Sequence, residues 1–253
     1  MKIIKKKSRK FEETLGGVKK TINKIENKEF QNMLFSVLRN NEKNLSEENI
    51  NKFEMIINAM SIVDRKYFAP FNCYVDEPII IGRGQTISQP TTVARMLLML
   101  DLKKGNSILE AGTGSGWNAA LISYIVKPGK VITCDRIYEL AKLAEKNING
   151  FIKKEKQKIN VKVAFADLLD ETTSIWKSKY SKIIITAGVS YPSLSQVKTM
   201  ALRLLSDNGL LIFPSIEIGN YGALELLQKK GNELKLIQRD EGYAFVPLLR
   251  KVE

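Results

Sequence analysis

Hydrophobic residues recur along the chain in two alternating patterns, and their alternation predicts the architecture. Short apolar runs are typical of buried strands, whereas apolar residues spaced three or four positions apart are typical of amphipathic helices. Strands are predicted at residues 107–111, 130–135, 161–167, 182–188 and 209–215. Helices are predicted between them at residues 117–126, 194–205 and 138–150, the last of which is expected to end at Gly150. Such alternation favours an α/β fold with a doubly wound, mostly parallel sheet.

The two ends of the chain depart from this alternation. Three upstream helices are predicted, at residues 31–39, 49–62 and 89–100. Residues 67–81 form an irregular crossing punctuated by proline. Near the C-terminus, residues 223–237 predict a hairpin and residues 243–249 a last strand, so the sheet is expected to close in antiparallel fashion.

The chain contains no histidine, which removes the commonest general base and the commonest metal ligand. Ser-His-Asp and Cys-His catalytic arrangements are therefore excluded. Cys73 and Cys134 stand outside any metal-binding or disulfide spacing, so no metal site is predicted. The chemistry must use carboxylates, lysine, tyrosine, hydroxyl groups, or a substrate that needs no base.

Positive charge is concentrated at the N-terminus. The formal net charge is +13, and residues 1–30 carry ten Lys and Arg against four Glu. A lysine-rich solvated extension explains this pattern, and a nucleic-acid or acidic-surface partner is the alternative. No run approaches about 18 apolar residues, and no apolar stretch follows the basic start, so we expect no membrane association and a cytoplasmic location.

Candidate binding residues cluster where the predicted parallel strands end. Glu110 and a glycine-rich loop at residues 112–116 end the first strand, Asp135 ends the second, and Asp167 ends the third. Ligands bind doubly wound sheets at this edge. Glycine lets the loop backbone approach a ligand closely, and an acid about twenty residues after such a loop can accept hydrogen bonds from ribose hydroxyls.

The details of the loop discriminate among nucleotide ligands. Trp117 stands where a dinucleotide fingerprint needs glycine, and no Lys-Ser/Thr pair follows, so neither an NAD turn nor a P-loop is favoured. Acids with no phosphate-binding cation suit S-adenosyl-L-methionine, which carries a sulfonium and an ammonium group. Structural roles stay open: Glu110 as a loop cap, Asp135 as a helix cap, and Asp167 as a turn residue.

Two motifs together resemble a known family. The stretch "GQTISQP" at residues 84–90, followed by "EAGTGSG" at residues 110–116, is similar to the core of the protein-L-isoaspartate O-methyltransferases. Further family segments are "NAMSIVDRKYFAP", "KIIITAG", "GLLIFP" and "YAFVPL". The resemblance covers roughly residues 50–250. It implies a Rossmann-like methyltransferase fold with a seven-stranded sheet and S-adenosyl-L-methionine as the cofactor.

The resemblance also implies roles for individual residues. Residues around the cofactor would be Thr86, Glu110, Gly112, Thr113, Gly114, Gly116, Asp135, Asp167 and Leu168. Asp135 would hold the ribose, and Asp167 with Leu168 would flank the adenine. Thr86, Ile87 and Ser88 would bind the substrate, with Ser88 at its carboxyl group as the catalytic residue. The family usually has glycine on both sides of the aspartate, where this chain has Ala166 and Leu168.

The implied domain is a single methyltransferase domain at residues 31–253, after a basic extension at residues 1–30. Within it, residues 31–104 would form a helical cover and a substrate strap, and residues 105–253 the cofactor-binding sheet. Gly82 and Gly84 would let the strap fold over the cofactor. Ser88 as a mere cap of the following helix is the alternative.

The expected activity is methylation of isoaspartyl residues in damaged proteins, which starts their repair. A carboxylate with a pKa near 4 is already ionised at neutral pH, so its attack on a sulfonium methyl needs no general base. The missing histidine fits this reaction. Alternatives are a carboxyl methyltransferase acting on a different aspartate or a dedicated peptide, and a basic RNA methyltransferase or non-catalytic cofactor-binding module.

Overall fold

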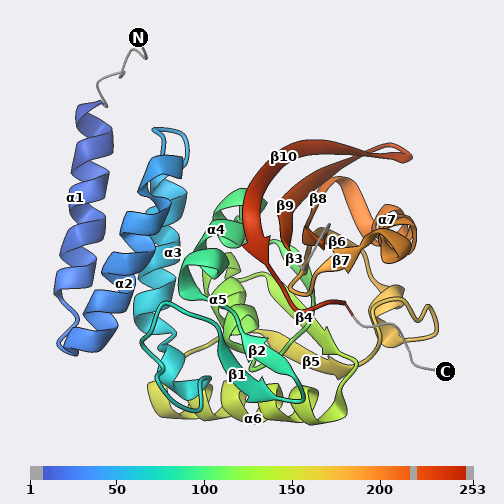
Figure 1. The fold of residues 1–253 in the computed structure, drawn as a ribbon, viewed down its shortest axis with the longest axis horizontal. Helices are drawn as coiled ribbons and strands as arrows, with labels where there is room; N and C mark the ends of the chain where they lie inside the picture. Colours follow the sequence, from blue (N-terminus) through green and yellow to red (C-terminus); the bar gives the residue numbers. More distant parts are fainter. Residues whose placement is uncertain (1–7, 217–220, 249–253) are drawn as a thin grey trace.

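Helices and strands alternate through the middle of the chain (Figure 1). The computed structural model describes residues 8–216 and 221–248, so residues 1–7 of the predicted extension and residues 249–253 of the predicted domain lie outside the described residues. The helices are α1 (Arg9–Asn23), α2 (Lys28–Asn41), α3 (Ile50–Ile62), α4 (Pro90–Leu100), α5 (Trp117–Val126), α6 (Tyr138–Glu155) and α7 (Tyr191–Leu204). The strands are β1 (Ile79–Gly82), β2 (Gln85–Ile87), β3 (Ser107–Ala111), β4 (Lys130–Asp135), β5 (Val161–Phe165), β6 (Tyr180–Ile185), β7 (Val189–Ser190), β8 (Leu205–Ile216), β9 (Tyr221–Lys230) and β10 (Glu233–Ala244).

The strands build one large sheet and one separate hairpin. In the described part of the chain, seven strands lie in the order β10-β9-β8-β6-β3-β4-β5, and β7 pairs with the end of β8. Neighbours from β5 to β8 are parallel, whereas β8, β9 and β10 pair in antiparallel fashion. The predicted doubly wound, mostly parallel sheet with an antiparallel C-terminal hairpin is confirmed. Among the described strands, β1 and β2 pair only with each other.

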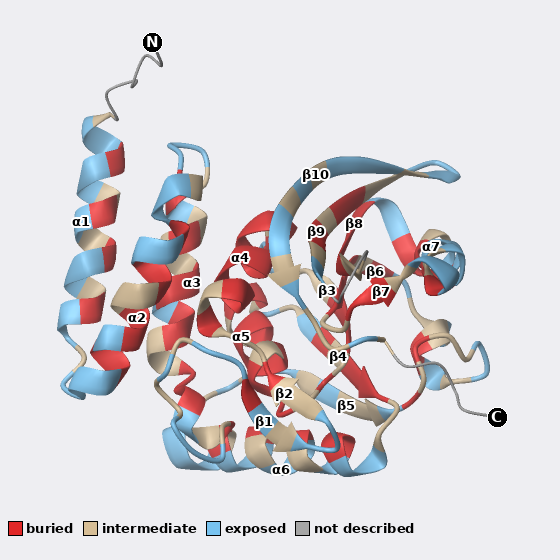
Figure 2. Ribbon diagram, in the orientation of Figure 1, coloured by how far each residue is buried: buried red, intermediate tan, exposed pale blue. Residues whose placement is uncertain are grey.

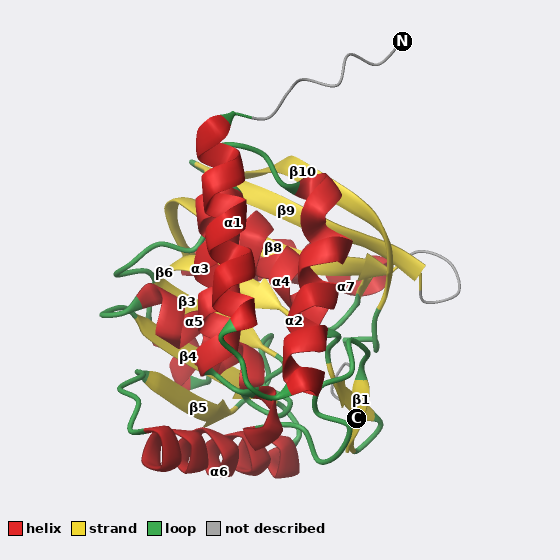
Figure 3. Ribbon diagram, turned by 90° about the vertical axis from the view of Figure 1, so that its left-hand side faces the viewer, coloured by secondary structure: helices red, strands yellow, loops and turns green. Residues whose placement is uncertain are grey.

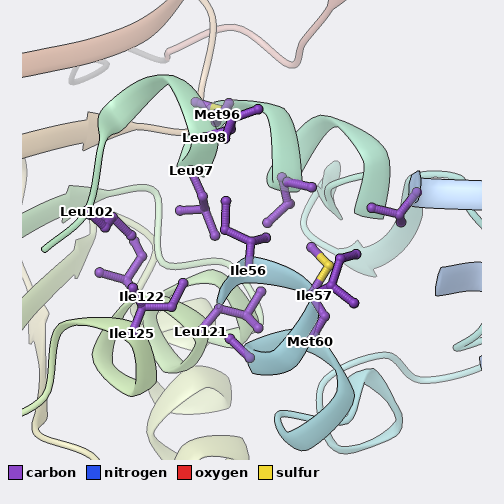
Figure 4. Packing of buried hydrophobic residues seen from close by; sticks show 14 of the residues in the cluster. Ile56, Ile57, Met60, Met96, Leu97, Leu98, Leu102, Leu121, Ile122 and Ile125 are labelled. Carbon is purple, nitrogen blue, oxygen red and sulfur yellow. The ribbon is translucent and has the colours of Figure 1, made fainter. Parts of the chain in front are cut away.

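Both faces of the sheet are covered, because successive strand residues point into two different cores. Ile108, Ile184 and Ile212 belong to the core beneath α4 and α5, whereas Leu109 and Ile183 belong to the core beneath α7. Figure 2 shows the central strands β3, β4, β6 and β8 and the inner helix faces mostly buried, whereas the edge strand β10 is largely exposed. Figure 4 shows side chains of α3, α4 and α5 meeting in the first core. Helix α4 is buried on nearly all sides because α2, α3 and the sheet surround it.

Several predicted boundaries differ from the structure, and the strand predicted at 182–188, for example, is β6 at Tyr180–Ile185. Helix α6 continues through Gly150 to Glu155, because Phe151 is fully buried and extends the apolar face of the helix. The third strand ends at Phe165, two residues early. Of the strand predicted at 243–249, Tyr243 and Ala244 form the end of β10, residues 245–248 make only a bridge to Gly188, and residue 249 lies outside the described residues.

Helix α1 is packed against the domain, although its residues were expected to be a solvated extension. Its Phe11, Leu15, Val18 and Ile22 are buried at helical spacing, and its charged face is exposed. The helix lies along α3, on the outer side of the helical layer (Figures 1 and 3). The boundary predicted at residue 31 falls inside α2. None of the helices in the described ranges has the length and apolar character that a bilayer crossing requires.

The packing of α1 predicts a stability difference between its two faces. Ile22→Ala should lower the free energy of unfolding by about 2–4 kcal/mol, because it empties a fully buried site. Lys19→Ala, on the exposed face, should change it by less than about 0.5 kcal/mol. Urea unfolding measures both, and equal losses for the two variants would show that α1 does not belong to the folded core.

Candidate active site

A cavity of about 600 Å³ lies at the carboxyl ends of the parallel strands. Its walls come from the loop after β3, the end of β4, the residues after β6, the first turns of α4, and the segment at residues 242–247. Residues 82–88, the strap, contribute Gln85 to Ser88. A smaller pocket of about 70 Å³ adjoins this cavity and shares Gln85, Gly112 and Asp135 with it. The chain therefore has one composite site at the edge predicted from the strand ends.

The glycine loop at residues 112–116 has a conformation that side chains would block. Gly112 has a φ of 90°, and a Cβ atom there would lie 2.3 Å from Thr186 Oγ1. The Thr186 hydroxyl donates to the Gly112 carbonyl at 2.7 Å, which holds the loop against the end of β6. Gly112, Thr113 and Gly114 line the cavity. Gly116 does not line it, and packs instead against Ile148 of α6.

Asp135 joins the glycine loop to the end of β4. Its Oδ2 accepts from the Gly114 backbone N–H at 3.1 Å, and its Oδ1 accepts from the Ile137 N–H at 3.0 Å. Burial raises the pKa of the Asp135 carboxyl, and these backbone bonds oppose the rise. The carboxylate is not a side-chain cap of α6. It lines both cavities, and each oxygen retains capacity to accept a further hydrogen bond.

Glu110 lies behind the cavity wall, whereas the family resemblance implied a position beside the cofactor. It is fully buried and accepts hydrogen bonds from Asn118 Nδ2 at 2.7 Å and from the Thr133 hydroxyl. The Thr133 hydroxyl also lies 2.7 Å from Thr113 Oγ1. Glu110 therefore braces two side chains that line the cavity, Asn118 and Thr113, rather than capping the loop backbone. Burial raises the pKa of Glu110 to about 7, against these two hydrogen bonds.

The strap crosses directly over the glycine loop. Gly82, Arg83 and Gly84 all have positive φ at its tip, where the chain reverses between β1 and β2. Arg83 forms an ion pair with Glu139, which links the tip of the strap to helix α6. A Cβ atom at Gly114 would lie 3.4 Å from Ile81 Cδ1, so the hairpin and the loop are in contact.

Ser88 does not cap helix α4. The helix begins at Pro90, and its first free N–H, from Thr91, donates to Asp76 Oδ1 at 2.8 Å. Asp76 is held in turn by Ser36 of α2, whose hydroxyl donates to Oδ2 at 2.8 Å. Within the described residues no group hydrogen-bonds to the Ser88 hydroxyl, and Ser88 lines the cavity. Asp76 thus performs the capping role that was open for Ser88.

The smaller pocket contains the third predicted acid. Asp167, Leu168 and Ala166 line it together with Arg136. Asp167 Oδ1 accepts from the Leu169 N–H at 2.9 Å, so this carboxylate also organises its own turn. Across the described residues, no group of three acidic or cysteine side chains is placed to hold a metal ion.

Several parts of the cavity wall were not predicted from the sequence, among them the first turns of α4 and α5, the residues after β6, and residues 242–247. Thr186 and Ala187 follow β6, and the same strand-end rule could have found them. Residues 242–247 follow no parallel strand, and only the family segment "YAFVPL" pointed to them. They reach the site because the Gly188 N–H donates to the Val246 carbonyl at 2.8 Å, and because Tyr243 donates to Asp240, the partner of Arg95.

Comparison with known proteins agrees with this geometry. A family model described as protein-L-isoaspartate(D-aspartate) O-methyltransferase (PCMT) matches residues 38–253. The protein-L-isoaspartate O-methyltransferase of Pyrococcus abyssi is 40% identical over 181 residues, or 70% of this chain and 76% of the relative. That of Ignicoccus hospitalis is 34% identical over 222 residues, or 83% and 95%.

Solved structures give the same result. A Plasmodium falciparum chain assigned to the protein-L-isoaspartate O-methyltransferases, in complex with S-adenosyl-L-homocysteine, superposes with a TM-score of 0.66. It is 26% identical, and the match covers 85% of this chain and 97% of that one.

The buried Glu110 predicts a specific pH dependence of stability. Its pKa in the folded protein, about 7, is above the ordinary value of 4.5, so its contribution to stability is present at low pH and is lost as pH rises through 7. Between pH 5 and pH 8, the wild type should lose about 2 kcal/mol more unfolding free energy than Glu110→Gln. Urea unfolding of both proteins without added cofactor measures this difference. If the unfolding free energies of the wild type and Glu110→Gln change with pH in parallel, burial does not raise the pKa of Glu110.

Proposed function

The chain belongs to the protein-L-isoaspartate(D-aspartate) O-methyltransferase family, and we propose that it methylates the α-carboxylate of L-isoaspartyl residues in damaged proteins. This reaction initiates repair of the damaged site. The observation that carries the proposal is Ser88, whose hydroxyl has no hydrogen-bond partner among the described residues and which lines the same cavity as the glycine loop and Asp135.

The cavity fits S-adenosyl-L-methionine as the cofactor. Among the described residues no lysine or arginine lines the larger cavity, whereas Asp135 does, and this suits a ligand with cationic groups and no phosphate. Gly112, Thr113 and Gly114 would lie along the methionine part, and Asp135 would accept from the ribose hydroxyls. Asp167 and Leu168 would flank the adenine in the smaller pocket. When bound, the cofactor supplies an electrophilic methyl group.

The protein's own contribution is then orientation of the substrate. Ser88 would donate a hydrogen bond to one oxygen of the substrate carboxylate and leave the other oxygen to attack. Thr86 and Ile87 would hold the adjoining backbone, since both line the cavity. No proton needs to move, because the carboxylate is already ionised. Alignment of the carboxylate with the methyl group would supply the acceleration.

The family match favours isoaspartyl proteins over the alternatives from sequence, a different aspartate substrate or an RNA-binding module. Nucleic-acid binding through the basic N-terminal segment stays a prediction, and so does a cytoplasmic location. The expected partners are therefore proteins or peptides that contain isoaspartate.

Matched peptides test the substrate assignment. An isoaspartyl residue carries its α-carboxylate on a shorter arm than the side-chain carboxylate of aspartate, so only one of them can be aligned with the methyl group. We expect methylation of the isoaspartyl peptide to be at least about 100-fold faster, since small displacements are costly in rate. Radiolabelled methyl transfer at equal peptide concentrations measures the ratio. Equal rates would contradict the repair assignment and favour another carboxyl substrate.

Two variants separate the proposed roles within the cavity. Ser88→Ala should lower turnover on the isoaspartyl peptide at least tenfold or so while changing cofactor affinity less, because the lost bond is to the substrate. Asp135→Ala should instead weaken cofactor binding, by about 1.5–3 kcal/mol per charged hydrogen bond lost. Steady-state kinetics and calorimetry measure the two effects. A fully active Ser88→Ala would remove Ser88 from the reaction.

A further inference from the structure

Arg65 is a fully buried cation that the proposed mechanism does not use. It begins the short 3₁₀ turn Arg65–Tyr67, between α3 and the strap, in the segment "NAMSIVDRKYFAP". Its exposed fraction is 0%. Arginine is almost never buried to this extent without a partner that requires it.

The guanidinium group binds four backbone carbonyls. Nη1 donates to Cys73 and Val75, both at 3.1 Å. Nη2 donates to Glu77 at 3.0 Å and to Ser88 at 3.2 Å. The irregular crossing before β1 and the exit of the strap after β2 are therefore attached to one rigid planar group. The main chain of Ser88 itself is one of the four attachment points.

The same group also contacts the cofactor side of the site. The Arg65 guanidinium lies over the Trp117 ring, 5.3 Å from its centroid. Trp117 is the first residue of α5, directly after the glycine loop, and it lines the cavity. Its Nε1 donates to the Val63 carbonyl at 2.9 Å, which fixes the ring. Arg65 thus joins the strap, which carries Ser88, to the helix that begins at the glycine loop.

Burial of the Arg65 charge carries a cost that its hydrogen bonds must offset. Arg65 forms no salt bridge to any described residue, and its Nε is buried without a hydrogen-bond partner. Burial lowers the pKa of Arg65 to about 10, so the group is still charged at neutral pH and bears the cost of desolvation. An apolar residue of similar size would avoid this cost, but it would leave the four carbonyls without their donor. What an apolar residue could not do is hold four carbonyls in fixed directions.

We infer that Arg65 is a positioning residue for methyl transfer, which acts through the backbone of Ser88. The inference rests on the proposed function, because it assigns Arg65 to the alignment of the substrate carboxylate. A displacement of about 1 Å at a reacting group can cost about 100-fold in rate. Without Arg65 the strap exit would lose its direct link to Trp117, and Ser88 would no longer be fixed relative to the glycine loop.

Arg65→Met tests the inference, with Lys182→Met as its matched control. Lys182 is also buried and also donates to backbone carbonyls, those of Leu100 and Asp101, but these lie at the opposite end of α4. Both variants should bind the cofactor within about threefold of wild type. Only Arg65→Met should lose kcat on the isoaspartyl peptide, by at least about 30-fold. A folded Arg65→Met with wild-type kcat would overturn the inference.

Two further variants keep the result decisive. Arg65→Lys retains the charge but not the planar fork, so it should lose kcat in the same direction even if Arg65→Met does not fold. Wild-type kcat in Arg65→Lys would also overturn the inference. In a double-mutant cycle, Ser88→Ala should cost less in an Arg65 variant than in the wild type, because the two residues act through one position. Additive losses would contradict action through Ser88.

The wild-type assay separates this inference from the proposed function. If the wild type does not prefer the isoaspartyl peptide, the proposed function fails. If the wild type shows the preference and the Arg65 variants retain its full turnover, only the role of Arg65 fails.

Discussion

The hydrogen bond from the Thr91 N–H to Asp76 is the interaction on which the rest of the site depends. The first N–H groups of any helix need acceptors, and Ser88 lies where it could have supplied one to α4. Asp76 reaches the helix from fifteen residues upstream and takes that role. Ser88 consequently has no capping role in α4, and it lines the cavity. Because Ser36 of α2 holds the same carboxylate, the N-terminal helices support the site indirectly.

The other contacts at the site each hold together two segments that are distant in the sequence. Arg65 holds the strap exit, Arg83 ties the strap tip to α6, and Asp135 holds the glycine loop. The Gly188 backbone holds the segment after β10. A chain without histidine lacks the commonest general base. Methyl transfer to an ionised carboxylate asks only for alignment, which this set of contacts provides.

The sequence predicted those features that depend on local pattern. Apolar periodicity identified the parallel strands, and the strand-end rule then placed Asp135 and the glycine loop in one site. Tertiary contacts decided what the pattern left open: the burial of Phe151 extends α6 past Gly150, and contact with α3 buries one face of α1. The capping role of Asp76 could not be predicted, because only the folded crossing brings it to α4. The position of Glu110 behind Thr113 and Asn118 could not be predicted either, because a carboxylate at a strand end can point to either side of the loop.

We expect orientation of the substrate carboxylate, without proton transfer, to account for the rate of methyl transfer. Single-turnover methylation of the isoaspartyl peptide in H₂O and in D₂O tests it most directly, with the protein saturated with S-adenosyl-L-methionine. If no proton is transferred in the chemical step, the ratio of the rate constant in H₂O to that in D₂O should be about 1. A ratio above about 2 would reveal a general base in the transition state and contradict the account.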